Sequence, residues 1–309
     1  MAATDEKLVH VNSPVPLRER NQRNGMKSIF SIDVEDWYHI LDLPSTPDLE
    51  KWDSLPSVVE KDFLKLLDVL EEKQVHVTCF FLGWVARKFP HLVREASARG
   101  HEIGSHGFAH RLVYAMTPDE FAQDLRLSKS ILEDILRKPV FGYRTSGFSV
   151  TEETPWFFEK IVEAGYTYDS SVFPAPRGHG GMKSNHLGPY VIETKSGRLL
   201  EFPITVTKIA GKALCFFGGG YLRLAPYSVI RNMTRKVLAE KRPVIFYVHP
   251  REIDPNHPRL AMGFMRRFKS YVNLGTTEGK IRRLAGDFSL TSFENFISEY
   301  YDQVENQNV

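Results

Sequence analysis

The sequence predicts an α/β fold built as one parallel barrel, and three observations support this interpretation. Segments typical of strands and of helices alternate along most of the 309-residue chain, as in parallel sheets with crossover helices. No internal repeat and no low-complexity linker divides the chain into modules. A barrel of this kind can exceed about 250 residues as one unit. We therefore expect one domain over residues 26–305, preceded by a polar N-terminal tail at residues 1–25.

The composition argues against several functional classes. The chain has 40 Lys and Arg residues against 38 Asp and Glu residues, a net charge of +2 that does not favour binding to nucleic acid or to a membrane through bulk charge. The longest segment without a charged residue, 74–86, is shorter than a membrane span, which needs roughly 18 apolar residues. The first 25 residues lack the apolar segment of a secretory signal. These features predict a protein of the cytoplasm or of the inner membrane face, with Cys79 and Cys215 as buried free thiols.

The first half of the chain alternates regularly between strands and helices. An apolar run after Gly25 predicts a strand with an acidic tip. Pro90 suits the first turn of a helix, and Thr117 with Glu120 has the pattern of a capping box. The expected elements are strands at 27–36, 75–83, 101–106, 140–144 and 166–171, and helices from 56, at 84–89, 90–100, 117–138 and 151–165.

The second half contains more loop. Gly and Pro dominate residues 173–189, where neither helical nor strand periodicity continues. This loop carries His179 and His186 and is either a mobile segment or a lid that contacts the substrate. The remaining expected elements are strands at 199–206, 213–217 and 244–249, and helices at 226–241 and 290–301.

Titratable side chains occur at the expected carboxyl ends of five strands. Each group alone has an ordinary structural explanation, such as a solvated strand end, a surface histidine or a hydrogen-bonded core residue. In a parallel barrel, however, all strand carboxyl ends open on the same face, where active sites form. We therefore predict one site from these groups, which are Asp33, Glu35 and Asp36, then His106 and His110, then Arg144, Asp169 and His249.

The spacing of His106 and His110 indicates a metal site. One helical turn places residues four apart on the same face, so both imidazoles can reach one ion. A carboxylate from another strand would complete the site and leave a coordination position open for water or substrate. If the strand continues, its alternation favours Glu35 as this carboxylate; if the strand ends near Val34, a turn brings Asp36 inward instead.

Five motifs in this order resemble those of the polysaccharide deacetylases of the NodB-homology type, also called carbohydrate esterase family four. The motifs read DVED, SHGFAH, RTSGF, YDSS and YVHP, and the match extends from about residue 28 to the final helix. The segments GGGYLRLAP, YVHPREIDPNHPR and YVNLGTTEGK are most similar to the branch found in bacterial exopolysaccharide gene clusters.

The resemblance implies a distorted (β/α) barrel that hydrolyses an N-acetyl group on an amino sugar of a bacterial glycan or glycan precursor. It also implies a divalent metal ion, usually Zn²⁺, held by His106 and His110. The usual acidic ligand of the family is an aspartate, which favours Asp36 and leaves Glu35 as the alternative. Such an ion polarises the amide carbonyl and lowers the pKa of a bound water toward ~7.

The resemblance further implies a role for each of the other four groups. Asp33 matches the catalytic base that accepts the proton of the water. His249 matches the general acid that protonates the leaving amine. Arg144 matches the residue that positions the base, and Asp169 the carboxylate that orients the acidic histidine.

Three positions depart from the pattern of the family. Val34 separates Asp33 from the following carboxylates, where the family commonly has adjacent aspartates. Gly107 stands in place of a serine or threonine, and the arginine motif reads RTSG where a proline is usual. These departures affect the acidic ligand, a local hydrogen bond and the pocket wall, and they remove no catalytic group.

Two other functions remain open at this point. A hydrolase of another amide, such as a formamide or ureide, needs the same residues, and a catalytically silent glycan-binding domain can share the fold. The presence of Asp33, His106, His110 and His249 together speaks against the silent domain, because binding alone requires neither acid nor base. The expected partner is an N-acetylated saccharide, more readily a nucleotide-linked or lipid-linked precursor than an exported polymer.

Overall fold

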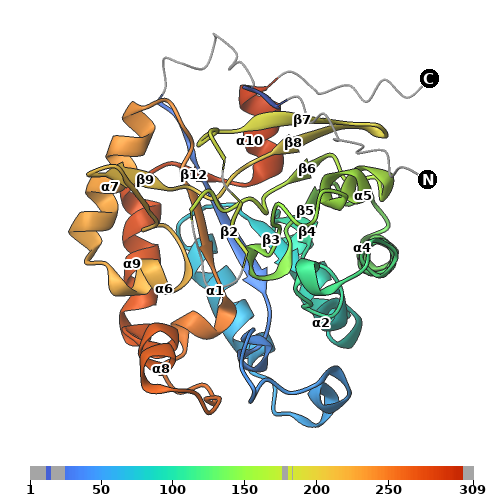
Figure 1. Ribbon diagram of the computed structural model, residues 1–309. Coiled ribbons are helices and arrows are strands. Elements are labelled where there is room, and N and C mark those ends of the chain that lie inside the picture. Colours follow the sequence, from blue (N-terminus) through green and yellow to red (C-terminus); the bar gives the residue numbers. More distant parts are fainter. Residues whose placement is uncertain (1–11, 15–24, 176–179, 183, 302–309) are drawn as a thin grey trace.

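A computed structural model describes residues 12–14, 25–175, 180–182 and 184–301 of the chain. Its main sheet has the strand order β1-β7-β8-β6-β5-β4-β3-β2-β11, and β12 also pairs with β2 (Figure 1). The strands are β1 (Asn12–Pro14), β2 (Ser28–Val34), β3 (Thr78–Phe81), β4 (Glu102–Ser105), β5 (Gly142–Tyr143), β6 (Tyr168–Asp169), β7 (Tyr190–Thr194), β8 (Gly197–Glu201), β11 (Ile245–Val248) and β12 (Leu290–Thr291).

In the strand order, all neighbouring strands from β8 through β6, β5, β4, β3 and β2 to β11 are parallel. This confirms the predicted α/β fold of the distorted-barrel type. At its other edge the sheet is mixed, because β7 pairs antiparallel with β8 and β1 pairs antiparallel with β7. Residues 12–14 of the expected polar tail thus form a strand. Next to β11, Phe217 accepts a backbone hydrogen bond from Tyr247 at 3.3 Å, which extends the barrel wall beyond the strands.

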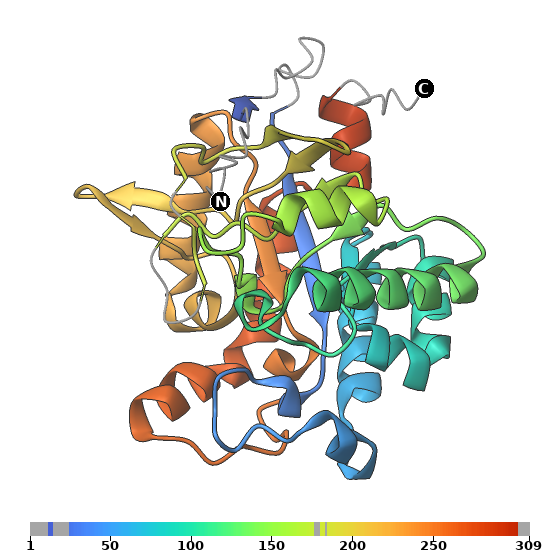
Figure 2. The ribbon, with the colours of Figure 1, turned by 45° about the vertical axis from the view of Figure 1, so that its right-hand side comes forward.

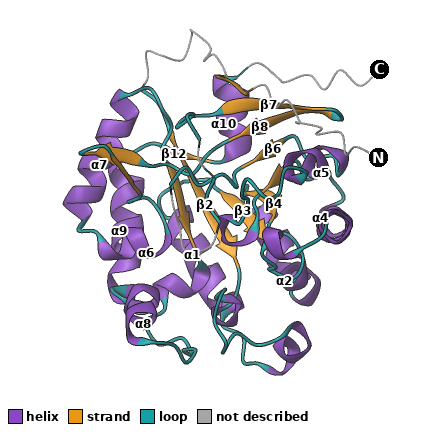
Figure 3. Cartoon of the chain, in the orientation of Figure 1, coloured by secondary structure: helices purple, strands orange, loops and turns teal. Residues whose placement is uncertain are grey.

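Helices cover the outer side of the sheet (Figures 1 and 3). Most expected helices are present, and Thr117 and Glu120 form the predicted capping box. The α-helices are α1 (Val59–Glu71), α2 (Gly83–Lys88), α3 (Pro90–Ala98), α4 (Pro118–Leu136), α5 (Phe157–Glu163), α6 (Gly219–Leu224), α7 (Tyr227–Ala239), α8 (Phe264–Tyr271), α9 (Leu274–Asp287) and α10 (Phe293–Tyr300). The 3-10 helices are η2 (Trp37–His39), η3 (Leu49–Ser54), η4 (Val113–Ala115), η5 (Ser146–Phe148) and η6 (Pro250–Ile253).

The structure differs from the sequence-based expectation mainly in the second half. The strand expected at residues 213–217 is shifted, because β9 (Thr207–Ile209) and β10 (Lys212–Leu214) form a separate antiparallel hairpin. Helices α6, α8 and α9 were not expected. The described part of the loop at 173–189 contains no helix or strand, as predicted, and His179 lies outside the described residues. In the described part of the chain, no helix combines the length and apolar character needed to cross a bilayer.

Aromatic side chains fill the interior of the barrel. Tyr168 and Phe293 stack with their ring centroids 5.2 Å apart, and Phe293 also packs against Phe80 and Phe202. On β2, alternate residues face this interior, so Asp33 lies on the inner face while Ile32 and Val34 belong to the core under the helices. The alternation therefore places Asp33 at the inner mouth of the barrel.

Candidate active site

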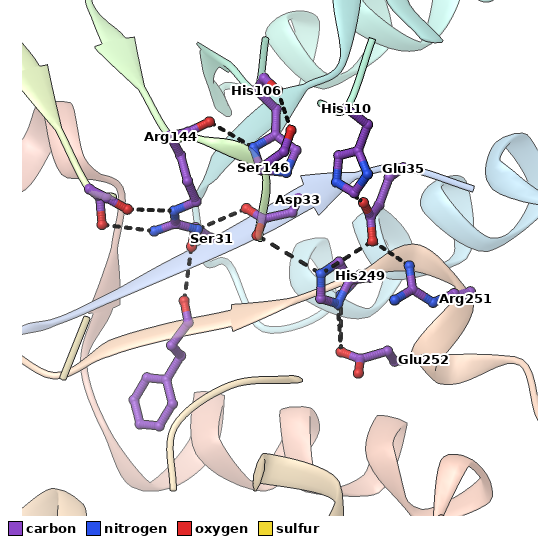
Figure 4. Close-up of polar contacts among 12 residues, drawn as sticks. Ser31, Asp33, Glu35, His106, His110, Arg144, Ser146, His249, Arg251 and Glu252 are labelled. Carbon is purple, nitrogen blue, oxygen red and sulfur yellow. Dashed lines mark hydrogen bonds and ion pairs between the residues drawn. The ribbon is translucent and has the colours of Figure 1, made fainter. Parts of the chain in front are cut away.

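A pocket opens at the carboxyl ends of β2, β4 and β11, where most of the predicted site residues meet. Asp33, Glu35, His106 and His110 are buried in its floor, and His249 is partly exposed to it. Figure 4 shows these side chains pointing toward one another from three different strands and the loops that follow them. The parallel arrangement thus brings together residues that are more than 200 positions apart in the sequence.

Glu35, His106 and His110 form a buried group that can hold a metal ion. Ligand atoms of the three residues lie within 4.8 Å of one another. The Nδ1 atom of His106 lies 2.8 Å from the carbonyl oxygen of Arg144, so a proton on Nδ1 leaves the Nε2 lone pair free. The Oε2 atom of Glu35 is 2.6 Å from Nε2 of His110. Two imidazoles and one carboxylate are a donor set that suits Zn²⁺ and related divalent ions, so these residues fit the expected metal.

Asp36 does not belong to this group, and the preference for it as the acidic ligand is corrected by the structure. Its carboxylate accepts hydrogen bonds from the backbone N–H of Trp37 at 2.8 Å and of Val58 at 3.2 Å. The hydroxyl of Ser57 also donates to it at 2.5 Å. The alternation of the strand continues one residue past β2, so Glu35 faces the histidines. Asp36 points away from them and connects η2 to the start of α1 through its hydrogen bonds.

His106 and His110 meet through a loop, and the expected helical turn is absent between them. Residues 106–110 follow β4 without helical structure, and His110 has a positive φ of 50°. Gly107 has a φ of 73°, and a Cβ atom there would lie 2.8 Å from Oδ2 of Asp124. That carboxylate accepts the N–H of Phe108 at 2.8 Å and so holds the loop. The glycine in place of serine or threonine is therefore required by this backbone conformation.

Asp33 and Arg144 form a buried ion pair inside the barrel. Nη1 of Arg144 donates to Oδ1 of Asp33 at 2.8 Å and to the Ser31 hydroxyl at 2.7 Å. The guanidinium carbon lies 4.4 Å from the centroid of the Phe80 ring, which supports it from one side. Although burial raises the pKa of Asp33, Arg144 and the neighbouring histidines hold that pKa below its usual value. Asp33 is therefore ionised at neutral pH, as a base must be.

His249 lies between two carboxylates of the floor and a third one behind it. Its Nε2 atom is 3.4 Å from Oε1 of Glu35 and 4.0 Å from Oδ2 of Asp33. Its Nδ1 atom is 3.3 Å from Oε2 of Glu252, which also accepts the backbone N–H of His249. Glu252 in turn pairs with Arg223. Burial lowers the pKa of His249 to about 3, so the free protein holds this side chain neutral at pH 7.

Asp169 lies away from His249, and its expected contact with that histidine is not observed. The hydroxyl of Ser171 donates to Oδ1 of Asp169 at 2.6 Å, and Glu201 is its neighbour on β8. Burial raises the pKa of Asp169 to about 6 and that of Glu201 further, so the two carboxyl groups share a proton at neutral pH. Among the described residues, Glu252 is the carboxylate beside Nδ1 of His249, and it takes the place expected for Asp169.

Sequence reasoning missed Glu252, Arg251 and His39. Arg251 contacts Oε1 of Glu35, and with His110 it holds the pKa of Glu35 well below its usual value despite burial. His39 accepts the N–H of Asp36 on Nδ1 at 2.9 Å, and its Nε2 atom is buried without a hydrogen bond. Arg251 and Glu252 directly follow the YVHP motif. Their proximity to His249, two and three residues away, was the signal available in the sequence.

Two family models match successive parts of the chain. Residues 52–168 match the family model of polysaccharide deacetylases, and residues 170–298 match a domain of unknown function (DUF3473). A peptidoglycan-N-acetylglucosamine deacetylase of Bacillus cereus is 26% identical over 102 residues, which are 33% of this chain and 46% of that protein. The chain spans less than half the length of the curated relatives that it matches first.

Solved structures show the same fold. A presumed polysaccharide deacetylase from Mycobacterium smegmatis superposes with a TM-score of 0.62 at 16% identity and covers 93% of each chain. The Puue allantoinase superposes with a TM-score of 0.59 at 15% identity over 88% of this chain and 89% of that one. Fold, motif order and the family match over residues 52–168 agree, and the chain contains a polysaccharide deacetylase domain of the NodB-homology type, carbohydrate esterase family four.

Proposed function

We propose that the protein is a metal-dependent N-deacetylase that releases acetate from an N-acetylated amino sugar of a bacterial glycan or glycan precursor. The observation that carries this proposal is the buried group of Glu35, His106 and His110 beside the ionised Asp33 and the imidazole of His249. The catalytic domain is residues 26–305. The relatives named for activity on peptidoglycan support the substrate class.

Glu35, His106 and His110 would hold the metal ion, most suitably Zn²⁺. When bound, a divalent ion at this group supplies a Lewis acid and lowers the pKa of water. Glu35 enters the site already ionised, because its pKa is well below the usual value. The hydrogen bond from His106 to the Arg144 carbonyl fixes the ring and its tautomer, so this imidazole offers Nε2 without reorganisation.

Asp33 acts as the base for the attacking water. Its Oδ1 atom is held by Arg144, so Oδ2, which faces His249, is the oxygen that can accept the proton. Arg144 is fully buried and also donates to Ser31 and to the carbonyl of Ser170, so it cannot swing away from Asp33. This arrangement positions the base before substrate binds.

His249 donates a proton to the nitrogen of the leaving amine. Because its pKa of about 3 makes it neutral in the free protein, it must receive that proton during the reaction. Oδ2 of Asp33, 4.0 Å from Nε2, carries the proton taken from water and is the group that can supply it. Glu252 on the Nδ1 side stabilises the imidazolium that forms.

The pocket walls suit a saccharide. Phe148, Tyr221 and Tyr247 line it together with Gly147 of the RTSG motif, and aromatic faces of this kind pack against sugar rings. We further propose that the substrate belongs to an exopolysaccharide pathway and is lipid-linked or nucleotide-linked in the cytoplasm. The similarity of the GGGYLRLAP and YVNLGTTEGK segments to that branch supports this part of the proposal.

Hydrolysis of another amide is the second candidate, because the Puue allantoinase shares the fold. The test is a panel of N-acetylated oligosaccharides, N-formyl sugars and cyclic ureides, with acetate, formate and the ring-opened carboxylate of the ureide measured separately. We expect acetate from the N-acetylated sugars, and a loss of roughly 10²–10⁴-fold in Asp33→Asn and in His249→Ala. Turnover of ureides alone would move the assignment to the second candidate, and wild-type rates in both variants would exclude these catalytic roles.

A further inference from the structure

Helix α8 exposes an apolar surface that nothing in the described structure covers. Phe264 is 84% exposed, Met265 63% and Phe268 47%, whereas Tyr271 is the only residue of the helix that is buried. Isolated helices of eight residues are marginal in water and usually gain stability by packing an apolar face. In α8 the large apolar side chains instead project into solvent.

The same segment is strongly basic. Residues 259–272 contain four cationic side chains and no Asp or Glu, and none of the four forms an ion pair with a described carboxylate. Arg267 and Lys269 are exposed beside the apolar residues. The full set of cations is Arg259, Arg266, Arg267 and Lys269. The near-zero net charge of the whole chain therefore hides a local patch of +4.

Helix α8 is also part of the wall of the catalytic pocket. Arg266 and Lys269 line that pocket together with Asp33 and His249, and Arg266 donates to the carbonyl oxygen of Leu41 at 2.9 Å. Arg223 holds the carboxyl end of the helix through the carbonyl oxygens of residues 269 and 270. Figures 1 and 2 show α8 at the end of the molecule toward which β2 runs. Helix α8 thus contributes Arg266 and Lys269 to the pocket wall, while Phe264 and Phe268 line a separate hollow on another side of the same helix.

From these observations we propose that α8 docks the protein on an anionic lipid surface, with the catalytic pocket opening beside that surface. Protruding aromatic and methionine side chains suit the acyl and headgroup boundary, and adjacent Lys and Arg side chains suit anionic headgroups. Helix α6, which contacts α8, also exposes apolar side chains, with Tyr221 43% and Leu224 52% exposed. Charge complementarity favours lipid over a second copy of this chain, because two patches of +4 would repel each other.

The test is co-sedimentation of the full chain with vesicles of phosphatidylcholine alone or with about one-third phosphatidylglycerol. We expect binding to the anionic vesicles, weakened by salt, and little binding to the neutral ones. Phe264→Ser with Phe268→Ser should lower the partition coefficient at least ~10-fold. Arg267→Gln should lower it about fivefold. These exposed residues leave the fold intact, which thermal unfolding of each variant checks.

Matched controls lie on α4, where Arg126 and the 44%-exposed Leu127 are also solvent-facing. Arg126→Gln and Leu127→Ser should bind vesicles like the wild type. Equal losses in these controls, or no binding to either vesicle, would overturn the proposal. A wild-type dimer that the double phenylalanine variant converts to monomers would assign the patch to a second copy. Asp33→Asn should bind as the wild type does, so the result is independent of the proposed reaction.

Discussion

The neighbouring residues Glu35 and Asp36 show how one position along a chain decides which side chain can reach a metal ion. Both alternatives were open from the sequence, since the answer depended on where β2 ends. In the structure, β2 ends at Val34, but the alternation persists for one more residue. Glu35 faces His110, and Asp36 accepts backbone hydrogen bonds at the start of α1. The aspartate preference failed because it relied on residue type rather than direction.

Metal analysis of two variants tests this assignment. Glu35→Gln should lose its metal, because the amide cannot replace the charged ligand of the group. Asp36→Asn should keep its metal and lose about 1 kcal/mol of unfolding free energy, since it weakens the hydrogen bonds to Trp37 and Val58. Metal content after gel filtration and thermal unfolding measure both effects. Full metal occupancy in Glu35→Gln would contradict the ligand set.

Glu252 lies beside Nδ1 of His249, where Asp169 was expected. Glu252→Gln should lower kcat by roughly 10–100-fold with little change in KM, because it removes the charge that orients and stabilises the imidazole. Asp169→Asn should stay within a few-fold of the wild type, since its carboxyl group shares a proton with Glu201. Steady-state acetate release measures both variants. The opposite ranking would restore the role first expected for Asp169.

At the level of secondary-structure elements, Glu102 connects three strands and a helix in the barrel interior. Its carboxylate accepts the Thr78 hydroxyl of β3 and the Tyr168 hydroxyl of β6, each at 2.5 Å. It also accepts the backbone N–H of Glu294 in α10 at 2.9 Å. Burial raises the pKa of Glu102 to about 7, so the folded protein keeps this group protonated in conditions where the unfolded chain has lost the proton.

This shift predicts how stability depends on pH. Between about pH 4.5 and 7 the folded state binds one more proton at Glu102 than the unfolded state does, so rising pH lowers the free energy of unfolding. Glu102→Gln should remove this contribution, which amounts to about 3 kcal/mol across the window. Urea unfolding at pH 5 and pH 8 measures the difference between wild type and variant. Parallel pH profiles of the two proteins would show that Glu102 does not titrate in this window.

The sequence predicted elements well where local signals were strong and less well where tertiary contacts decide. The capping box at Thr117 and the apolar strand of β11 were found because each carries its own local pattern. The strand expected at 213–217 instead forms a hairpin before Cys215, because its partner β9 determines where pairing stops. Helix α8 was not predicted although Phe264, Phe268 and Tyr271 stand at helical spacing, because eight residues are fewer than the window of about 11 in which that spacing is diagnostic.

On the scale of the whole molecule, the location of the site was predictable from the sequence. The residues that contact the catalytic side chains from behind, such as Glu252 beside His249, were not. Parallel strands deliver their carboxyl ends to one face, so Asp33, His106, Arg144 and His249 had to converge. Which carboxylate lies beside Nδ1 of His249 depends on how η6 turns after the strand, and its signal in the sequence was the spacing of three residues from His249 to Glu252, which lies beyond the YVHP motif. The net charge of +2 likewise did not indicate the basic surface around α8, because acidic residues elsewhere in the 309-residue chain balance the four cations of residues 259–272.

The most direct test of the central claim is Zn²⁺ titration of metal-free protein while acetate release from an N-acetylglucosamine oligosaccharide is recorded. The account predicts no release without metal, then a rise that levels off at about one ion per chain, as expected for a single catalytic metal site. Asp33→Asn should bind Zn²⁺ equally well and release at most ~1% of the wild-type acetate. Release at the full rate by rigorously metal-free protein would contradict the account.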